Sequence, residues 1–565
     1  MTDDTRHQRL DRRSFISYFS AAGLSSTLLP GALWARAQEQ GFVTTGMIAE
    51  AEKLAGLEFT DEEREEMVRG LDQNARAWAQ LREVEIPNSV HPALIFDPVP
   101  PGMTLPSERR AAILGPAPRV ERPGNLEEAA FWSVRELAEL VRSRQVSSAE
   151  LTEMYLGRIE KHGPTLESVI TVTRERALDQ AMRADREIAA GRYRGPLHGI
   201  PWGAKDLLSV RGYRTTWGAL PYEEQQFDMD ATVVERLDTA GAVLVAKLTL
   251  GALAQGDVWY GGRTRNPWDL EQGSSGSSAG SASSVVAGLC GFTIGTETLG
   301  SIVSPATRCG ATGLRPTFGR VSRHGAMALS WSMDKIGPIC RTVEDCALVF
   351  AAIHGPDGHD PTIRDVPYNW DATLSPQRLR VGYLRSAFER DRNGREFDDA
   401  AIDVLRGMGI DLIPVEWPDR FPLAAMRPIL TAESAAAFDD LTRSGRDAMM
   451  EESSSWPNTF RTARLIPAVE YIQANRVRTM LIDESNAVLS DVDVIVSPAS
   501  GNDTLLLTNL TGHPCVVLPN GFRENGTPVS LSFIGRLFGE AEVLAVANAY
   551  QRATDFHTRR PPLFS

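Results

Sequence analysis

GSSGSSAGSASS, residues 273–284, is the stretch whose interpretation decides the fold. Its composition alone would suit a flexible linker. Its neighbours argue otherwise, because Val285-Val286-Ala287 continues it as a helix that can be buried, and Phe292-Thr293-Ile294 has the pattern of a strand. A linker would not be embedded between packed elements. The stretch therefore predicts a segment in which glycine permits close backbone approach and unusual dihedral angles.

Helices and short strands alternate on both sides of this stretch. A capping box of Ser147 and Glu150 opens one predicted helix, and residues 175–190 have helical spacing. Apolar runs at 242–246 and 492–496 predict strands. This alternation predicts the α/β class, with a mostly buried sheet.

Composition fits a soluble globular protein with room for a large core. The chain has 565 residues, 42% of them hydrophobic and 23% charged, with a net charge of −14. That charge argues against nucleic acid as the main partner, since phosphate binding needs a basic surface. The five cysteines include no CxxC pair, so we expect buried apolar side chains and no zinc or iron–sulfur site.

The first 37 residues have the pattern of an export signal. Arginines precede an apolar stretch with serines at 15–33, and Ala35-Arg36-Ala37 fits a cleavage site. The segment DRRSFI, Asp11 to Ile16, resembles a twin-arginine signal. We expect residues 1–37 to be removed, which leaves a periplasmic or secreted protein without a stable membrane span; retention as an anchor is the alternative.

An N-terminal extension follows, at residues 38–128. Residues 38–86 are predicted to be helical, with a capping box of Thr60 and Glu63. Nine prolines within residues 87–123 exclude regular helix or central strand there. This part is predicted to run extended, either docked on a larger body or as a linker.

Four motifs occur in a fixed order: GPLHGIPWGAKD (195–206), GSSAGSASSVVAG (276–288), TETLGSIVSP (296–305) and NLTGHP (509–514). In this order they resemble the amidase signature family over roughly residues 133–553. The resemblance implies an α/β fold with a central mixed β-sheet flanked by helices. It places an amidase domain at 129–557 and a C-terminal tail at 558–565.

The resemblance also implies a Ser–cis-Ser–Lys triad. By motif position Lys205 is the lysine, Ser277 the bridging serine after a cis peptide bond, and Ser301 the nucleophile. The implied oxyanion hole consists of backbone N–H groups, and Ser278 supports the site. The oxyanion-hole residues are Thr298, Leu299, Gly300 and Ser301.

Residue chemistry agrees with this assignment. A serine hydroxyl needs a base, and no histidine stands in a motif suited to that role. A lysine can serve if burial lowers its pKa, and Ile200-Pro201-Trp202 makes an apolar setting for Lys205. Ser277 would relay the proton. We also expect Ser304 to cap a helix that begins at Pro305, just after the nucleophile.

Two positions depart from the family pattern. Leu299 replaces a usual glycine, so its N–H must be donated with a side chain attached. Val303 stands where many members have an arginine, which holds the carboxylate of glutamine in the A subunits of tRNA-dependent amidotransferases. Its absence predicts a substrate with no carboxylate at that point.

Three alternatives remain open. Residues 276–280 also match G-x-S-x-G, the α/β-hydrolase elbow, with Ser278 as the nucleophile of an esterase; that motif should follow a hydrophobic strand, and Asp269–Gly273 is predicted not to be one. The other two are a glutaminase like the amidotransferase A subunits and a catalytically silent binding protein.

Several further residues are predicted to be structural: Asp206, Glu297, Trp202, Trp331, Met327, His198, His324 and His513.

The sequence thus predicts an exported amidase acting on a linear carboxamide, in a small molecule or at a peptide terminus, through a Ser301 acyl-enzyme. It implies no metal or organic cofactor, and its expected partner is a small amide, not nucleic acid. Residues 370–480 are expected to shape substrate choice; the substrate itself and the oligomeric state are not encoded in any motif.

The export signal makes a direct prediction. Protein recovered from the periplasm or medium should begin at Gln38, because cleavage follows Ala37. Intact mass spectrometry measures this, with a variant in which Arg12 and Arg13 are both lysine as the export-deficient control. Exported protein that still carries residues 1–37 would contradict cleavage at this site.

Overall fold

The computed structural model describes residues 43–81, 84, 86–90, 94–390 and 393–565. The chain divides into two compact units, Met1–Val90 and His91–Ser565. The predicted signal peptide lies outside the described residues. Within the described residues, no helix combines the length and apolar character needed to cross a membrane.

The N-terminal unit contains two helices, α3 (Thr45–Ala55) and α4 (Asp61–Leu81). The predicted capping box at the start of α4 is confirmed: the Thr60 N–H donates to Glu63 Oε2 at 2.7 Å, and the Glu63 N–H to Thr60 Oγ1 at 3.2 Å. A small apolar cluster joins the helices. Its members are Val43, Met47, Ile48, Met67, Val68 and Leu71.

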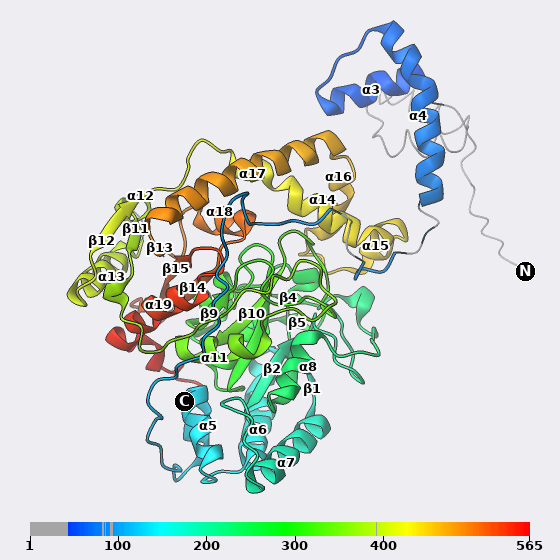
Figure 1. Cartoon of the computed structure of the whole chain (residues 1–565). Coiled ribbons are helices and arrows are strands. Elements are labelled where there is room, and N and C mark those ends of the chain that lie inside the picture. The colour runs from blue at the N-terminus through cyan, green and yellow to red at the C-terminus, as the bar shows by residue number, and fades with distance from the viewer. Residues whose placement is uncertain (1–42, 82–83, 85, 91–93, 391–392) are drawn as a thin grey trace, which may run out of the picture. The chain divides into compact units, whose positions relative to one another are not determined.

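An 11-stranded mixed sheet forms the centre of the second unit (Figure 1). Neighbouring strands are parallel within β3-β2-β8 and within β13-β11-β12, and antiparallel elsewhere. The strands, in their order across the sheet, are β1 (Val169–Val172), β3 (Val243–Leu248), β2 (Pro201–Lys205), β8 (Phe292–Glu297), β10 (Lys335–Cys340), β9 (Thr312–Arg315), β14 (Cys515–Phe522), β15 (Pro528–Gly535), β13 (Val494–Pro498), β11 (Val381–Leu384) and β12 (Leu412–Val415).

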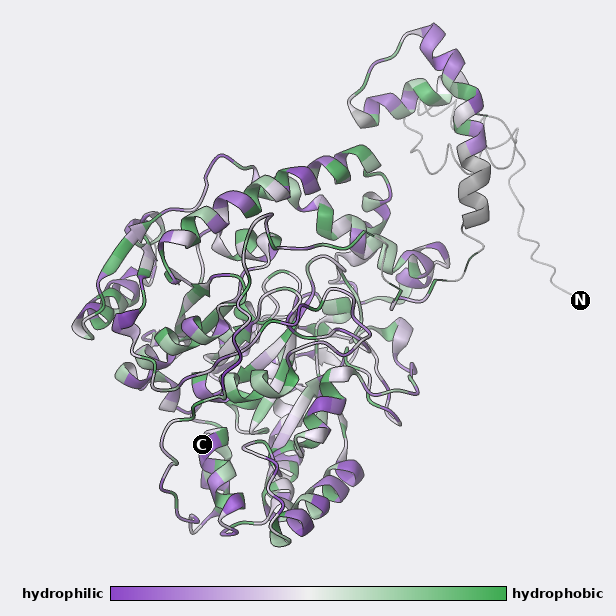
Figure 2. Ribbon diagram, viewed as in Figure 1, coloured by the Kyte–Doolittle hydropathy of each residue, from purple (hydrophilic) through white to green (hydrophobic). Residues whose placement is uncertain are grey.

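Helices cover this sheet, so the predicted α/β class is confirmed. Among them α6, α9, α10, α11 and α19 pack directly on strands. Figure 2 shows hydrophilic residues over much of α7, whose outer face meets solvent. The helices of this unit are α5 (Val134–Arg142), α6 (Ser148–Leu166), α7 (Arg174–Ala189), α8 (Thr232–Thr239), α9 (Ala279–Val286), α10 (Val303–Cys309), α11 (Val343–Ile353), α12 (Arg385–Glu389), α13 (Arg395–Gly407), α14 (Pro428–Ala437), α15 (Asp439–Arg443), α16 (Trp456–Ala463), α17 (Ala468–Asp491), α18 (Thr504–Thr511) and α19 (Glu540–Thr554).

Local signals in the sequence account for several of these elements. The Ser147–Glu150 capping box opens α6 as predicted. Strands β2 and β3 are buried along their whole length, which agrees with their near-continuous apolar sequences. The stretch 279–286 forms α9 and is entirely buried, so its small residues serve close packing rather than flexibility.

The proline-rich stretch is docked where the structure describes it. The Phe96 ring meets Phe318 edge-on at 5.0 Å, and the Ile113 N–H donates to the Trp370 carbonyl at 2.8 Å. Val99, Met103 and Leu105 pack against a buried apolar cluster. In Figure 1 this segment is the thin blue coil that crosses in front of the helices and loops of the main unit. Residues 94–116 therefore behave as part of the main unit and not as a linker.

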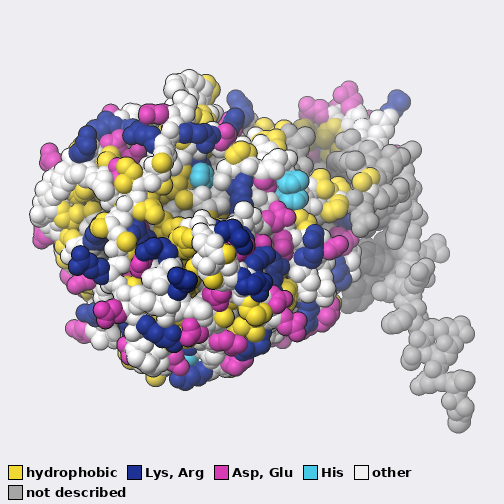
Figure 3. All heavy atoms as spheres, turned by 60° about the horizontal axis from the view of Figure 1, so that its bottom comes forward, with side chains coloured by type: hydrophobic (Ala, Val, Ile, Leu, Met, Phe, Trp, Pro, Cys, Tyr) yellow, Lys and Arg dark blue, Asp and Glu magenta, His cyan; other side chains and the backbone are white. Residues whose placement is uncertain are grey.

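All five cysteines are buried and unpaired, as predicted. Basic and acidic side chains are interspersed over the face shown in Figure 3, with no extended basic area on that face.

Candidate active site

Lys205 is the last residue of β2, and β2 is flanked by β3 and β8, which both run parallel to it. Carboxyl ends of parallel strands meet at one edge of a sheet, where ligand sites of α/β proteins are commonly found. Ala204 is in register with Ile294, so the side chains of Lys205 and Thr296 are brought to the same edge.

Three hydroxyl groups surround the Lys205 amine. Its Nζ lies 2.8 Å from Ser277 Oγ, 2.9 Å from Thr296 Oγ1 and 3.1 Å from Ser278 Oγ. Burial lowers the pKa of Lys205 to about 7, although the negative charges of Asp334 and Glu297 act in the opposite direction. A substantial fraction of the amine is therefore neutral near pH 7 and able to accept a proton.

The segment that carries Ser277 is fixed by close backbone contacts. The Gly276–Ser277 peptide bond is cis, as the resemblance implied. A Cβ at Gly276 would lie 1.8 Å from the Gly256 carbonyl oxygen, so no side chain fits there. The Ser278 N–H donates to the Ser301 carbonyl at 3.1 Å, which joins the bridging-serine segment to the predicted nucleophile. Lys205, Ser277, Ser278 and Ser301 thus converge on one place.

Ser278 is held by β8. Its hydroxyl accepts from the Thr296 N–H at 3.1 Å and donates to the Thr296 carbonyl at 3.0 Å. The prediction that no strand precedes it is wrong, because Asp269–Gly273 forms β7. That strand pairs only with β6 (Arg265–Asn266) in a separate ribbon outside the central sheet. The arrangement differs from the α/β-hydrolase elbow, in which the serine tops a strand of the main sheet.

Glu297, at the end of β8, orders the loop after Ser301. Its carboxylate accepts from the N–H groups of Ile302 at 2.8 Å and Val303 at 2.9 Å, and from Arg315 Nη1 at 2.8 Å. Asn509 Nδ2 adds a contact of 2.7 Å. Burial alone would raise its pKa, but Arg315 and these hydrogen bonds hold the pKa of Glu297 at about 2. The predicted structural role of Glu297 agrees with these contacts.

The predicted Ser304 cap is wrong. Helix α10 begins at Val303, and Ser304 lies inside its first turn. The physical reason is that the Glu297 carboxylate accepts hydrogen bonds from the N–H groups of Ile302 and Val303. The helix can therefore begin at Val303, two residues before the predicted start at Pro305.

The predicted oxyanion segment is the turn between β8 and α10. Gly300 has φ +91°, and a Cβ there would lie 2.9 Å from Ser304 Oγ, so glycine is required. Leu299 directs its side chain into an apolar cluster with Met333 and Leu507, which accommodates a larger residue than glycine at this position. Thr298 donates its hydroxyl to Asp334 Oδ1 at 2.6 Å.

Other predicted residues lie in supporting contacts. Asp206 forms a buried ion pair with Lys247 at 2.6 Å, so its predicted structural role fits. Val303 is 2% exposed within an apolar cluster.

Among the described residues, no group of three or more His, Cys, Asp or Glu side chains is arranged to hold a metal ion.

Sequence reasoning missed Thr296, Asn509 as a partner of Glu297, and Asp334. Thr296 and Asn509 stand at the first positions of two recognised motifs, TETLGSIVSP and NLTGHP, which was an available signal. Asp334 lies in no recognised motif, and its contact with Thr298 is visible only once β8 and β10 are paired.

Comparisons with known proteins agree with this geometry. The amidase family profile matches residues 150–508. The chain is 37% identical over 474 residues to the A subunit of the glutamyl-tRNA(Gln) amidotransferase of Roseiflexus sp. (strain RS-1), covering 75% of this chain and 97% of the relative. The structure of native peptide amidase from Stenotrophomonas maltophilia superposes with a TM-score of 0.71 and 32% identity, covering 78% of this chain and 100% of that one. An amidase family protein from Bacillus anthracis gives a TM-score of 0.69 at 28% identity, covering 77% of this chain and 93% of that one.

The Lys205 environment predicts a pH dependence. The kcat/KM for an amide should rise with pH through about 7, where the ammonium loses its proton, and level off above it. Lys205→Met, which keeps the length of the side chain but removes the base, should lower kcat by about 10²–10⁴-fold. Steady-state kinetics from pH 5 to 9 measures both, with the exposed Lys161→Met as the matched control. A flat profile with acylation limiting the rate would contradict Lys205 as the base.

Proposed function

The chain belongs to the amidase signature family, whose members hydrolyse amides, and we propose that it is an exported amidase acting on linear carboxamides in small molecules or at peptide termini. In this proposal Ser301 is the nucleophile, Ser277 the proton relay and Lys205 the base. The observation that carries it is the position of the Lys205 amine, 2.8 Å from Ser277 Oγ and with a pKa lowered to about 7 by burial.

The proposed reaction moves one proton along this chain of groups. Ser301 Oγ attacks the amide carbonyl while its proton passes to Ser277, whose own proton passes to Lys205. The oxygen of the tetrahedral intermediate becomes negative and accepts from the N–H groups of the 298–301 turn. When the C–N bond breaks, the proton returns through Ser277 to the departing nitrogen. A water molecule then hydrolyses the Ser301 ester by the same route in reverse.

The predicted preference for substrates without a carboxylate near the nucleophile rests on Val303. Its side chain is buried among apolar residues and offers no positive charge two positions after Ser301. We therefore favour an amidase over a glutaminase, although amidotransferase A subunits are among the relatives. The likeness to a peptide amidase supports the inclusion of peptide amides among the substrates.

Export to the periplasm or medium belongs to the same proposal and rests on the sequence of residues 1–37. We likewise propose that the hydrolase domain spans 129–557, with 38–128 as its N-terminal extension and 558–565 as its C-terminal tail. The docked segment between Leu94 and Pro116 supports a role for this proline-rich part of the extension in covering the hydrolase domain.

The test is release of amine or ammonia from a panel of primary amides, peptide amides, anilides, carbamates and glutamine. Wild type should cleave at least one carboxamide, and Ser301→Ala should lower kcat by at least about 10³-fold while circular dichroism and Tm stay unchanged. Ser278→Ala should retain more activity than Ser301→Ala. In this proposal the Ser278 hydroxyl has only a supporting role, in which it accepts hydrogen bonds from the Lys205 amine and from the Thr296 N–H group of β8.

Two outcomes would overturn the proposal. Hydrolysis that survives Ser301→Ala but is lost in Ser278→Ala would assign the reaction to the elbow serine of an esterase. Glutamine as the best substrate would favour the amidotransferase-like glutaminase.

A further inference from the structure

Asp334 connects the predicted oxyanion segment to a neighbouring loop. Its Oδ1 accepts from the Thr298 hydroxyl at 2.6 Å, and its Oδ2 accepts from the N–H groups of Leu329 at 2.8 Å and Ser330 at 3.0 Å. We propose that Asp334 is a positioning residue that fixes Thr298, and with it the oxyanion-binding N–H groups, against the 329–334 loop. This inference rests on the proposed function, since it assigns a role within the same site.

The sheet explains why these two residues meet. Strand β10 runs antiparallel to β8, with Lys335 in register with Glu297. One step beyond this pair, where β8 ends and β10 begins, the register places Asp334 opposite Thr298. The contact is therefore set by the strand pairing and not by a flexible loop.

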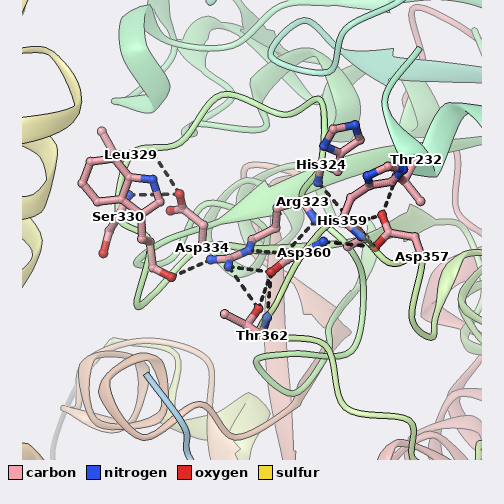
Figure 4. A network of polar contacts seen from close by, with 12 residues as sticks. Thr232, Arg323, His324, Leu329, Ser330, Asp334, Asp357, His359, Asp360 and Thr362 are labelled. Atoms are coloured by element: carbon pink, nitrogen blue, oxygen red, sulfur yellow. Dashed lines mark hydrogen bonds and ion pairs between the residues drawn. The ribbon is translucent and has the colours of Figure 1, made fainter. Parts of the chain in front are cut away.

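The loop that receives Thr298 is itself held firmly (Figure 4). Arg323 donates to the Trp331 carbonyl at 2.6 Å and pairs with Asp360 through contacts of 2.8 and 3.2 Å. Figure 4 shows Asp334 beside Leu329 and Ser330, with the Arg323–Asp360 pair farther along the same network. Asp334 thus connects the turn to a loop that Arg323 holds at the Trp331 carbonyl, while Asp360 holds Arg323.

This arrangement matters for the reaction because oxyanion stabilisation depends on donors that are oriented before the charge forms. The Thr298 side chain is bound at its hydroxyl, so rotation of this residue, and of the N–H group that it carries, is restricted. If the hydroxyl is removed, the turn keeps its covalent structure but loses this restraint. The loss should therefore reduce kcat more than it changes KM.

The decisive variant is Thr298→Val, which keeps the shape of the side chain and removes the hydroxyl. It should lower kcat about tenfold or more, with KM within about twofold of wild type. Thr298→Ser restores the hydroxyl and should recover kcat to within about threefold. Thr293→Val, on the preceding strand β8, is the matched control. It removes a buried hydroxyl that lies within hydrogen-bond distance of the Ser281 and Ile339 carbonyls, and it should leave kcat unchanged.

A second variant separates positioning from a purely structural role. Asp334→Asn removes the carboxylate that acts against the lowering of the Lys205 pKa, so the acid limb of the pH–rate profile should move to lower pH. Other charged groups also act on Asp334 and Lys205: Glu297 of β8 acts on Lys205, and Lys335 of β10 and Arg323 act on Asp334. Arg315 of β9 acts on Glu297 and Lys335. That shift reports the charge of Asp334. Its positioning role predicts in addition that kcat on the pH plateau falls while KM changes little, whereas a merely structural aspartate would change Tm and leave the plateau kcat in place.

Equal kcat values for Thr298→Val and Thr293→Val would overturn the inference, as would failure of Thr298→Ser to recover activity. Labelling by a fluorophosphonate probe makes this result distinguishable from failure of the proposed function. Wild-type labelling at Ser301 together with an unaffected Thr298→Val would reject only the positioning role. Absence of labelling at Ser301 and of any turnover would reject the proposed function itself.

Discussion

The surroundings of the Lys205 amine are the constraint on which the rest of the site depends. Its hydrogen-bonding neighbours at 2.8–3.1 Å are hydroxyl groups and not a carboxylate. Lys247, one strand away, has Asp206 at 2.6 Å. Burial lowers the pKa of both lysines, and the Asp206 carboxylate opposes this effect at Lys247 by contact. The hydroxyls around Lys205 carry no charge that would oppose it, and burial lowers the pKa of Lys205 to about 7. The same sheet therefore contains one buried lysine in contact with a carboxylate and one whose hydrogen-bonding neighbours are hydroxyl groups.

The remaining parts of the site serve to maintain this arrangement. Parallel pairing of β2 and β8 places Lys205 beside Thr296, and Ser278 is clamped to the Thr296 backbone. Glu297 holds the start of α10, so the turn that carries Ser301 is fixed at its far end. Asp334 restrains the near end of the same turn through Thr298. Preorganisation of this kind is a large part of what an enzyme contributes to acyl transfer.

The sequence allowed the α/β class, the two capping boxes and the convergence of Lys205, Ser277 and Ser301 to be predicted, because each depends on a local pattern or a recognisable motif. It did not reveal the order of the eleven strands, since most neighbours in the sheet are distant in sequence. The same limit explains the wrong prediction that Ser304 caps α10. Ser304 and Pro305 have suitable local chemistry, but Glu297, at the end of β8, accepts the N–H group of Ile302, and the helix begins before Ser304. Strand β7 was missed because its sequence DLEQG is polar and pairs only in a small ribbon.

The central claim is that Lys205 is neutral for a substantial fraction of the time near pH 7, and the most direct test is titration of its amine by nuclear magnetic resonance. Protein labelled with ¹³C at lysine Cε would be followed from pH 5 to 11, with Lys205→Met used to assign the signal. We predict a midpoint near 7, well below the ordinary lysine value of 10.5. A signal that titrates only near the ordinary value would show that the amine stays charged at neutral pH, and would contradict the account.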